Sequence, residues 1–162
     1  MSISIEDIIT DVLKREGSQT NDSADKGGRT AFGVSEKSNL GAWLDDEVSE
    51  KEARAIYYKK YVKWPGFDKI EDDPLKAQLI DFGVNSGPQR AILALQTILG
   101  TEQDGLLGPE TLTALEASDA TKTNNKLVIE RIKMFCNIVI RNPSQLKFLR
   151  GWINRGFEFL TY

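Results

Sequence analysis

Hydrophobic residues recur at helical spacing along most of the chain. Near the N-terminus they follow the three- and four-residue intervals of an amphipathic helix, at Ile5, Ile8, Ile9, Val12 and Leu13. Ser4 lies three residues before Asp7, in capping-box spacing, and Gly17 is a natural stop for the helix. The pattern therefore predicts a first helix that ends at about residue 16.

Start and stop signals place further helices along the chain. Ser49 with Glu52 is a second capping-box pair, and it opens a helix that ends before Trp64. Three prolines stand where the first turn of a helix accepts proline: Pro74, Pro88 and Pro109. Gly83 and Gly87 are expected to break or kink the helix that follows the first of them. Two long apolar helices are expected at about residues 125–141 and 143–160.

The segment after Gly17 is polar, contains several glycines and has no helical period. Within it Thr30, Phe32 and Val34 alternate with small residues, which predicts a small β-hairpin near residues 28–36. The fold class is therefore mostly α, with a helical-bundle core. The length favours a single domain over residues 1–162. A subdivision into lobes 1–99 and 100–162 is possible, because a loop follows Gly100.

Composition removes several kinds of chemistry. The chain has no histidine and one cysteine, Cys136, so Ser–His–Asp catalysis, Cys–His catalysis and a His-ligated zinc site are excluded. Cys136 lies in an apolar helical segment, which indicates a packed small side chain. The aromatic residues Trp152, Phe157 and Phe159 are expected in the core. Acid–base chemistry near neutral pH must therefore rely mainly on carboxylates, and no metal or organic cofactor is expected.

Charge and hydropathy limit the partners. A net charge of −3 argues against a nucleic-acid-binding protein held by phosphate contacts. The first residues carry acids and no basic region, so they do not have the pattern of a secretory signal. An apolar run long enough to span a membrane does not occur. No nucleic-acid binding and no membrane insertion are therefore expected.

Glu16 breaks the pattern of the first helix. At 100° per residue it falls at roughly 20° from Ile5, at the centre of the apolar stripe. Desolvation and the negative end of the helix dipole would both raise its pKa, which suits a general acid at neutral pH. The alternative is a frayed last-turn residue that faces solvent.

Asp25 and Thr30 follow Glu16 in a glycine-bearing loop. Gly27 and Gly28 allow a tight turn and the close approach of a ligand. A loop that returns over the helix end could bring Asp25 and Thr30 near Glu16, giving the acid and second polar group that glycoside hydrolysis needs. The alternatives are a turn-forming aspartate and an ordinary strand threonine.

The spacing of Glu16, Asp25 and Thr30 resembles the Glu–Asp–Thr arrangement of phage lysozymes. More closely, the chain resembles glycoside hydrolase family 108, whose members are N-acetylmuramidases, largely phage endolysins. The matching segments span most of the chain: Glu16-Gly17, Asn21-Asp22, residues 25–35, 52–58, Tyr61, 81–88, Ala91, Leu95-Gln96 and 104–111. The last segment resembles the family's C-terminal peptidoglycan-binding-like region.

The chain also departs from the family pattern. Ser18 and Gln19 stand where the family usually has a second glycine and a nearby aromatic residue. Lys26 often corresponds to proline, and Ala31-Phe32 to Asn-Tyr. These differences bear on contacts to the sugar more than on the acid.

The resemblance implies a lysozyme-like α+β fold and roles for individual residues. Glu16 would be the catalytic acid, with Asp25 as base or electrostatic partner and Thr30 positioning water or substrate. Substrate-binding residues would be Gly28, Arg29, Asn85 and Tyr57. Asn85 could equally cap a helix, and Tyr57 belongs to an aromatic group (Tyr57, Tyr58, Tyr61 and Trp64) whose helical spacing also fits a core.

The implied function is that of a phage endolysin that lyses the host cell. It would hydrolyse the β-1,4 bond between N-acetylmuramic acid and N-acetylglucosamine in peptidoglycan glycan strands. It would accumulate in the host cytoplasm, pass through a holin and act in the periplasm or cell wall. The alternatives are a non-catalytic peptidoglycan-binding or structural module, and a lytic transglycosylase, in which the sugar's own hydroxyl attacks.

Overall fold

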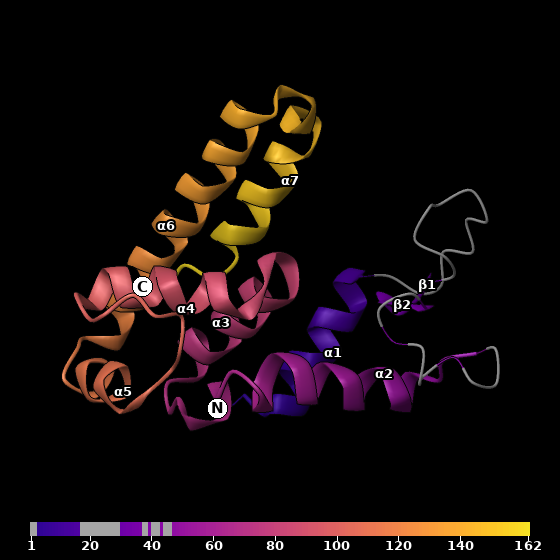
Figure 1. Ribbon diagram of the computed structural model, residues 1–162, viewed down its shortest axis with the longest axis horizontal. Coiled ribbons are helices and arrows are strands. Elements are labelled where there is room, and N and C mark those ends of the chain that lie inside the picture. The colour runs from indigo at the N-terminus through magenta and orange to yellow at the C-terminus, as the bar shows by residue number, and fades with distance from the viewer. Residues whose placement is uncertain (1–2, 17–29, 37–38, 40–42, 44–46) are drawn as a thin grey trace. The chain divides into compact units, whose positions relative to one another are not determined.

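The computed structural model describes residues 3–16, 30–36, 39, 43 and 47–162 (Figure 1). The chain forms two compact units, Met1–Trp64 and Pro65–Tyr162. Each unit is described by itself. The expected mostly α, lysozyme-like fold is confirmed.

The first helix, α1 (Ile5–Glu16), begins and ends as predicted. Ser4 Oγ accepts a hydrogen bond from the Asp7 backbone N–H at 3.1 Å, and Asp7 Oδ2 accepts one from the Ser4 N–H at 3.2 Å. These bonds satisfy N–H groups that a helix start leaves without partners. The buried side chains are those of the apolar stripe: Ile8, Ile9, Val12 and Leu13.

The predicted hairpin is present and small. Strands β1 (Thr30–Ala31) and β2 (Val34–Ser35) are antiparallel, with Thr30 opposite Ser35 and Ala31 opposite Val34. The two turn residues, Phe32 and Gly33, have φ angles of 50° and 73°. Positive φ at both positions characterises the type I′ turn, whose twist matches that of paired strands.

Helix α2 (Glu50–Tyr57) continues as the π-helical segment η3 (Tyr58–Lys63). Ser49 and Glu52 form the predicted capping box at its start. Arg54 connects α2 to α1, since its Nη1 donates to Thr10 Oγ1 at 2.9 Å while Nη2 contacts Glu50 Oε1 at 2.7 Å. This connection fixes the two helices of the first unit against each other.

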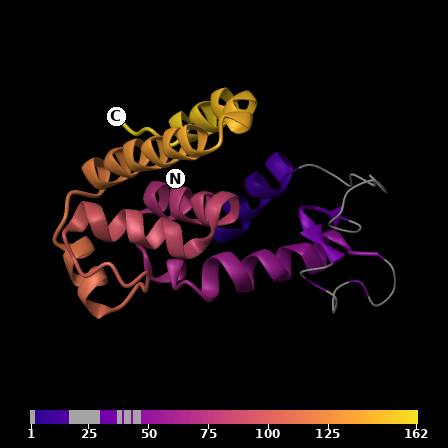
Figure 2. The same ribbon diagram turned by 45° about the horizontal axis from the view of Figure 1, so that its top comes forward.

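The second unit is entirely helical. Its elements are η4 (Phe67–Lys69), α3 (Asp73–Ser86), α4 (Pro88–Leu99), α5 (Pro109–Glu116), α6 (Ala120–Arg141), η5 (Pro143–Gln145) and α7 (Leu146–Phe157). Helices α3, α4 and α6 pack against one another, and α7 lies along α6 (Figures 1 and 2). The predicted division of the chain into lobes 1–99 and 100–162 would cut through this unit. That division stays a prediction.

Helix α3 runs unbroken through Gly83, so the break expected there does not occur. A Cβ at Gly83 would lie 3.4 Å from Pro88 Cα and 3.5 Å from the Phe67 ring. Both are ordinary van der Waals distances, so the start of α4 and the Phe67 ring pack directly over this position. The helix ends at Gly87, whose φ of 94° few other residues adopt.

Two expectations for the C-terminal helices are wrong in detail. Helix α6 begins at Ala120 rather than near residue 125, because the Asp119 side chain accepts a hydrogen bond from the Lys122 N–H and caps it. The expected helix at 143–160 is a short 3₁₀ turn followed by α7, which ends at Phe157. Phe157 is 51% exposed and not in the core, whereas Trp152 and Cys136 are half-buried.

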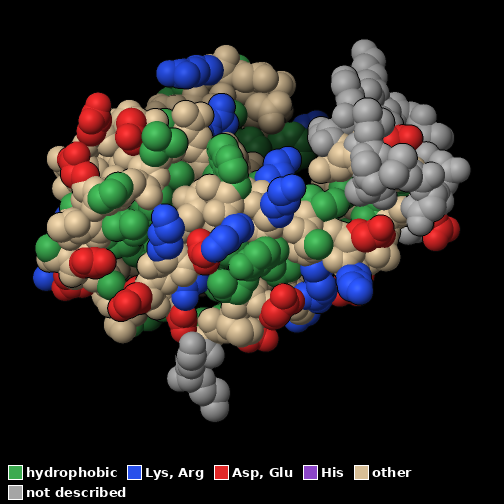
Figure 3. All heavy atoms as spheres, turned by 60° about the horizontal axis from the view of Figure 1, so that its bottom comes forward, with side chains coloured by type: hydrophobic (Ala, Val, Ile, Leu, Met, Phe, Trp, Pro, Cys, Tyr) green, Lys and Arg blue, Asp and Glu red, His purple; other side chains and the backbone are tan. Residues whose placement is uncertain are grey.

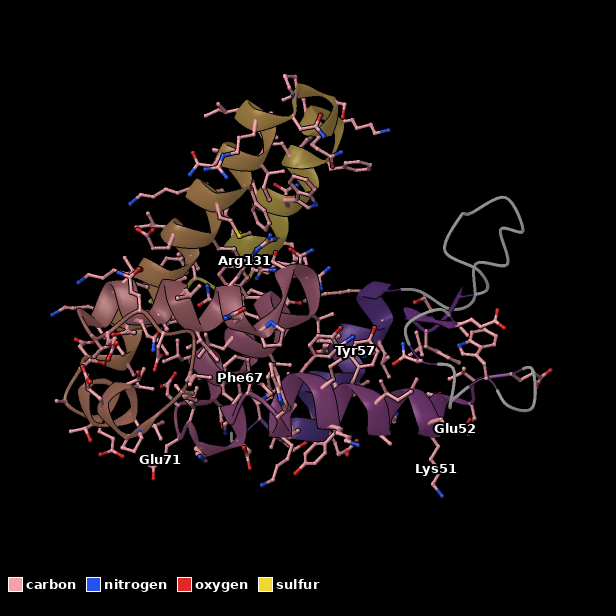
Figure 4. The ribbon with its side chains drawn as sticks, viewed as in Figure 1. Lys51, Glu52, Tyr57, Phe67, Glu71 and Arg131 are labelled. Atoms are coloured by element: carbon pink, nitrogen blue, oxygen red, sulfur yellow. The ribbon has the colours of Figure 1, made fainter. Side chains whose placement is uncertain are left out.

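A buried ionic cluster ties three helices of the second unit together. Asp81 of α3 accepts a hydrogen bond from Arg131 Nη2 of α6 at 2.6 Å and one from Arg155 Nη2 of α7 at 2.9 Å. The Asp81 side chain is 1% exposed and that of Arg131 is fully buried. Arg131 lies where α3, α6 and α7 meet (Figure 4). Its guanidinium also stands over the Phe82 ring, 5.2 Å from the centroid.

The loop after α4 is built around a buried amide. Gln96 Nε2 donates to Asp104 Oδ1 at 2.7 Å, and Gln96 Oε1 accepts from the Gly105 N–H at 2.9 Å. Gly105 has a φ of 73°, and a Cβ there would lie 2.7 Å from Gln89 Cγ. The Asp104-Gly105 segment, which resembles a binding-module turn, thus has a structural role.

Candidate active site

The candidate acid Glu16 is the last residue of α1. Its backbone position follows Ile9 by seven residues and Val12 by four, so the helical register continues the buried stripe of Ile9 and Val12 to this point. The expectation that the glutamate stands at the end of the first helix is therefore confirmed for the backbone.

Of the residues predicted to act with Glu16 near the hairpin, the structure describes Thr30 but not Asp25, Gly28 or Arg29. Thr30 is the first residue of β1, so the threonine lies in a β element as expected. Asp25, Gly28 and Arg29 lie outside the described residues, and their roles stay predictions. The described segments that border this region are the end of α1 and the hairpin that begins at Thr30.

The hairpin turn is held by Tyr57. The Tyr57 hydroxyl donates to the Phe32 carbonyl at 3.1 Å, which links α2 to the turn between β1 and β2. Tyr57 is 4% exposed, and Figure 4 shows it on the opposite side of α2 from Lys51. A ring buried in this way positions the hairpin, while a direct contact of Tyr57 with sugar stays a prediction.

Phe32, in the turn between β1 and β2, is not among the predicted site residues. It is the one non-glycine residue with positive φ in the described part of the chain. For a bulky side chain this conformation is strained, and such strain concentrates near functional sites. The sequence does contain a signal for this turn. Phe32-Gly33 lies between two short segments with the alternating pattern of strands, which is the position of a two-residue hairpin turn.

The other aromatic residues of this unit differ in exposure. Tyr61 packs against Tyr57, with ring centroids 5.3 Å apart and the ring planes tilted by 44°. Trp43 is 7% exposed, whereas Tyr58 is 39% and Trp64 73% exposed. Tyr58 and Trp64 therefore present the largest accessible rings of the group predicted to stack on sugar.

Asn85 lies in the last turn of α3, in the second unit. It is half-buried, and its Oδ1 accepts a hydrogen bond from Ser86 Oγ at 3.0 Å. Its role as a substrate-binding residue stays a prediction.

Neither a metal centre nor a membrane span is found in the described segments. In that part of the chain no group of three or more His, Cys, Asp or Glu side chains could hold a metal ion. A search of its helices finds none long and apolar enough to cross a membrane. Acidic and basic side chains both occur across the face drawn in Figure 3.

Comparisons with known proteins identify the family. Residues 9–87 match the model described as glycosyl hydrolase 108, and residues 90–157 match one described as a predicted peptidoglycan domain. Residues 9–87 therefore form a glycoside hydrolase family 108 region. It is also similar to a solved structure, SagA of Brucella abortus, with 27% identity and a TM-score of 0.74. That match covers 95% of this chain and 90% of the other. The comparison with curated proteins gave no match.

The protein is thus a glycoside hydrolase with a peptidoglycan-degrading role. Its two family regions meet between Gly87 and Arg90, at the start of α4. Residues 65–87 therefore belong to the hydrolase region while they pack in the same unit as the helices of the peptidoglycan region. Helix α3 lies in the hydrolase region and carries Asn85 of the predicted site. Its Asp81 also forms the ionic cluster with helices of the peptidoglycan region.

Proposed function

We propose that the hydrolase is an endolysin-type muramidase that cleaves the β-1,4 bond between N-acetylmuramic acid and N-acetylglucosamine. Glu16 protonates the glycosidic oxygen, and positive charge develops on the sugar ring. Asp25 stabilises that charge or activates water, and Thr30 positions the water or the substrate. The observation that carries the proposal is the position of Glu16 at the end of α1, in a chain that matches glycoside hydrolase family 108.

Family membership disfavours the non-catalytic alternative but leaves two reaction types. A hydrolase transfers the sugar to water, and a lytic transglycosylase transfers it to the sugar's own hydroxyl. Both require an acid at the leaving oxygen, so Glu16 serves either reaction. Asp25 and Thr30, which could handle water, favour hydrolysis.

The test replaces Glu16 by glutamine and measures the clearing of a cell-wall suspension. Glu16→Gln keeps the size of the side chain and removes the transferable proton, so activity should fall at least about a hundredfold. Glu6→Gln is the matched control, because Glu6 lies on the same helix with its side chain 74% exposed. It should clear the suspension like the unsubstituted protein. Near-normal clearing by Glu16→Gln would refute the assignment of the acid.

Mass spectrometry of the released fragments distinguishes the two reactions. Reducing N-acetylmuramic acid ends are expected for the proposed muramidase. Fragments ending in 1,6-anhydro sugars would show a transglycosylase instead. Reducing N-acetylglucosamine ends would place the cut at the other glycosidic bond.

Host lysis and release through a holin complete the proposal. Expression in the bacterial cytoplasm should leave growing cells intact until the inner membrane is permeabilised, after which the culture should clear. Clearing without permeabilisation would contradict the need for a holin. Cells expressing Glu16→Gln are the control, since they should stay turbid in both conditions.

A further inference from the structure

We propose that the groove between α4 and α6 binds the stem peptide of peptidoglycan through the carboxylates of that peptide. The groove has a volume of about 440 Å³ and lies in the region that matches the predicted peptidoglycan domain. The inference rests on the proposed action on peptidoglycan, and it concerns a surface of the second unit, whereas Glu16 belongs to the first.

The charge of the groove departs from that of the whole chain. Its rim carries Arg90, Lys133 and Arg141 against one acid, Glu130, although the chain has a net charge of −3. Residues 131–157 contain no acid, and of the six cations in this segment Lys133 and Arg141 line the groove. This asymmetry favours an anionic ligand at the groove.

Two of the rim cations are available to a ligand. Lys133 contacts Glu130 at 2.7 Å, whereas Arg90 and Arg141 are exposed and have no carboxylate partner among the described residues. An arginine can bind a carboxylate through two parallel N–H groups, which makes it the side chain best suited to this recognition.

The floor of the groove is apolar and offers no aromatic platform. It is formed by half-buried side chains of α4 and α6, among them Leu93, Ala94, Met134 and Ile138. The one aromatic residue in the lining, Phe82, is 1% exposed. Sugar rings usually stack on exposed aromatic faces, so the floor suits the aliphatic part of a peptide better than a glycan.

The length of the groove matches a short peptide. The lining of α6 runs from Glu130 to Arg141, which at 1.5 Å per residue is about 16 Å. An extended peptide of five residues at 3.3 Å per residue also spans about 16 Å. In peptidoglycan the lactyl carboxyl of the muramic acid is consumed in joining the stem peptide, so the free carboxylates lie on the stem.

The test measures the binding of a soluble synthetic stem peptide, L-Ala-γ-D-Glu-meso-diaminopimelate-D-Ala-D-Ala, to the full chain by calorimetry. The Glu16→Gln background is used so that the same protein can be titrated with intact wall fragments without cutting them. The Arg90→Gln/Arg141→Gln variant should weaken binding of the peptide by about tenfold or more. Arg150→Gln is the matched control, because Arg150 is exposed on α7 and does not line the groove.

The outcomes separate this inference from the proposed function. Binding that the two groove substitutions weaken, that the control preserves and that added salt reduces would support it. No binding of the stem peptide, or equal binding by all variants, would overturn it. A loss of affinity for peptide-free glycan in the groove variant would also overturn it, since the occupant would then be the sugar. Reducing ends released by the protein with Glu16 intact report the hydrolase activity independently.

Discussion

Replacing Asp81 by asparagine tests whether the buried ionic cluster holds the helices of the second unit together. Asp81 is 1% exposed and accepts hydrogen bonds from Arg131 Nη2 at 2.6 Å and from Arg155 Nε and Nη2 at 3.1 and 2.9 Å. Asparagine keeps the size of the side chain but removes its charge. Two guanidinium groups would then face a neutral amide, and one of them, that of Arg131, is fully buried.

The magnitude follows from what is left behind. Breaking a buried ion pair by removing one partner costs roughly 3–5 kcal/mol, because the remaining charge cannot be solvated. The Arg155 side chain is 18% exposed and can recover part of its hydration, so the lower half of that range is expected. Most of the loss should come from Arg131, whose side chain also packs between the Phe82 and Phe135 rings.

The assay is urea unfolding followed by far-UV circular dichroism. Asp119→Asn is the control in the same unit, because asparagine caps a helix about as well as aspartate. Asp119 also pairs with Lys122 at 3.4 Å, but both side chains are at least half exposed, so less than about 1 kcal/mol should be lost. If Asp81→Asn were no more destabilising than Asp119→Asn, the ionic cluster would not contribute to the stability of the second unit as its geometry indicates.

Four further predictions concern pH, the hairpin and one turn. Burial alone would raise the pKa of Asp81, but the hydrogen bonds and charges of Arg155 and Arg131 outweigh it and hold this pKa below its ordinary value of 3.8. The contribution of the Asp81 charge to stability is therefore present above about pH 4 and is lost as the pH falls through the folded-state pKa; acid titration of the unfolding free energy should show this loss, and Asp81→Asn should lack it. Tyr57→Phe removes the 3.1 Å bond to the Phe32 carbonyl, so stability should fall by about 1 kcal/mol and wall clearing should slow; no change in either would deny the hydroxyl a positioning role. Phe32→Asn should raise the melting temperature slightly, because asparagine tolerates positive φ better, whereas a clear fall would show that packing of the phenylalanine outweighs its strain. Gly105→Ala should lower the free energy of unfolding by about 1–2 kcal/mol, since its Cβ would lie 2.7 Å from Gln89 and its φ is 73°; an unchanged urea midpoint would show that the turn adapts freely.

Local signals predicted the helix starts well. The Ser49–Glu52 capping box, the Ser4–Asp7 pair and the prolines at helix starts act within one turn of chain, so their consequences can be read from neighbouring residues. The hairpin was predicted for the same reason. The position of Glu16 at the end of α1 also follows from local spacing, because an acid that interrupts an apolar stripe is visible in the sequence itself.

Polar residues that are buried by distant partners could not be predicted in this way. The expected helix began at about residue 125, after a run of polar residues, yet Asn124 is fully buried and its Nδ2 donates to the Phe159 carbonyl at 2.7 Å. The start of α6 was therefore placed too late. Arg131 likewise looks like the polar face of a helix, although its partner Asp81 lies 50 residues earlier.

The groove arginines differ from the buried arginines in their partners. Arg131 and Arg155 are used by Asp81, and their charges are neutralised inside the unit. Arg90 and Arg141 have no such carboxylate among the described residues, and both line the groove. Sequence alone shows only that residues 131–157 lack acids. Of the cations in that segment the fold neutralises Arg131 and Arg155, and it places Arg141, together with Arg90 of α4, at the groove between α4 and α6 for which we propose a carboxylate-bearing ligand.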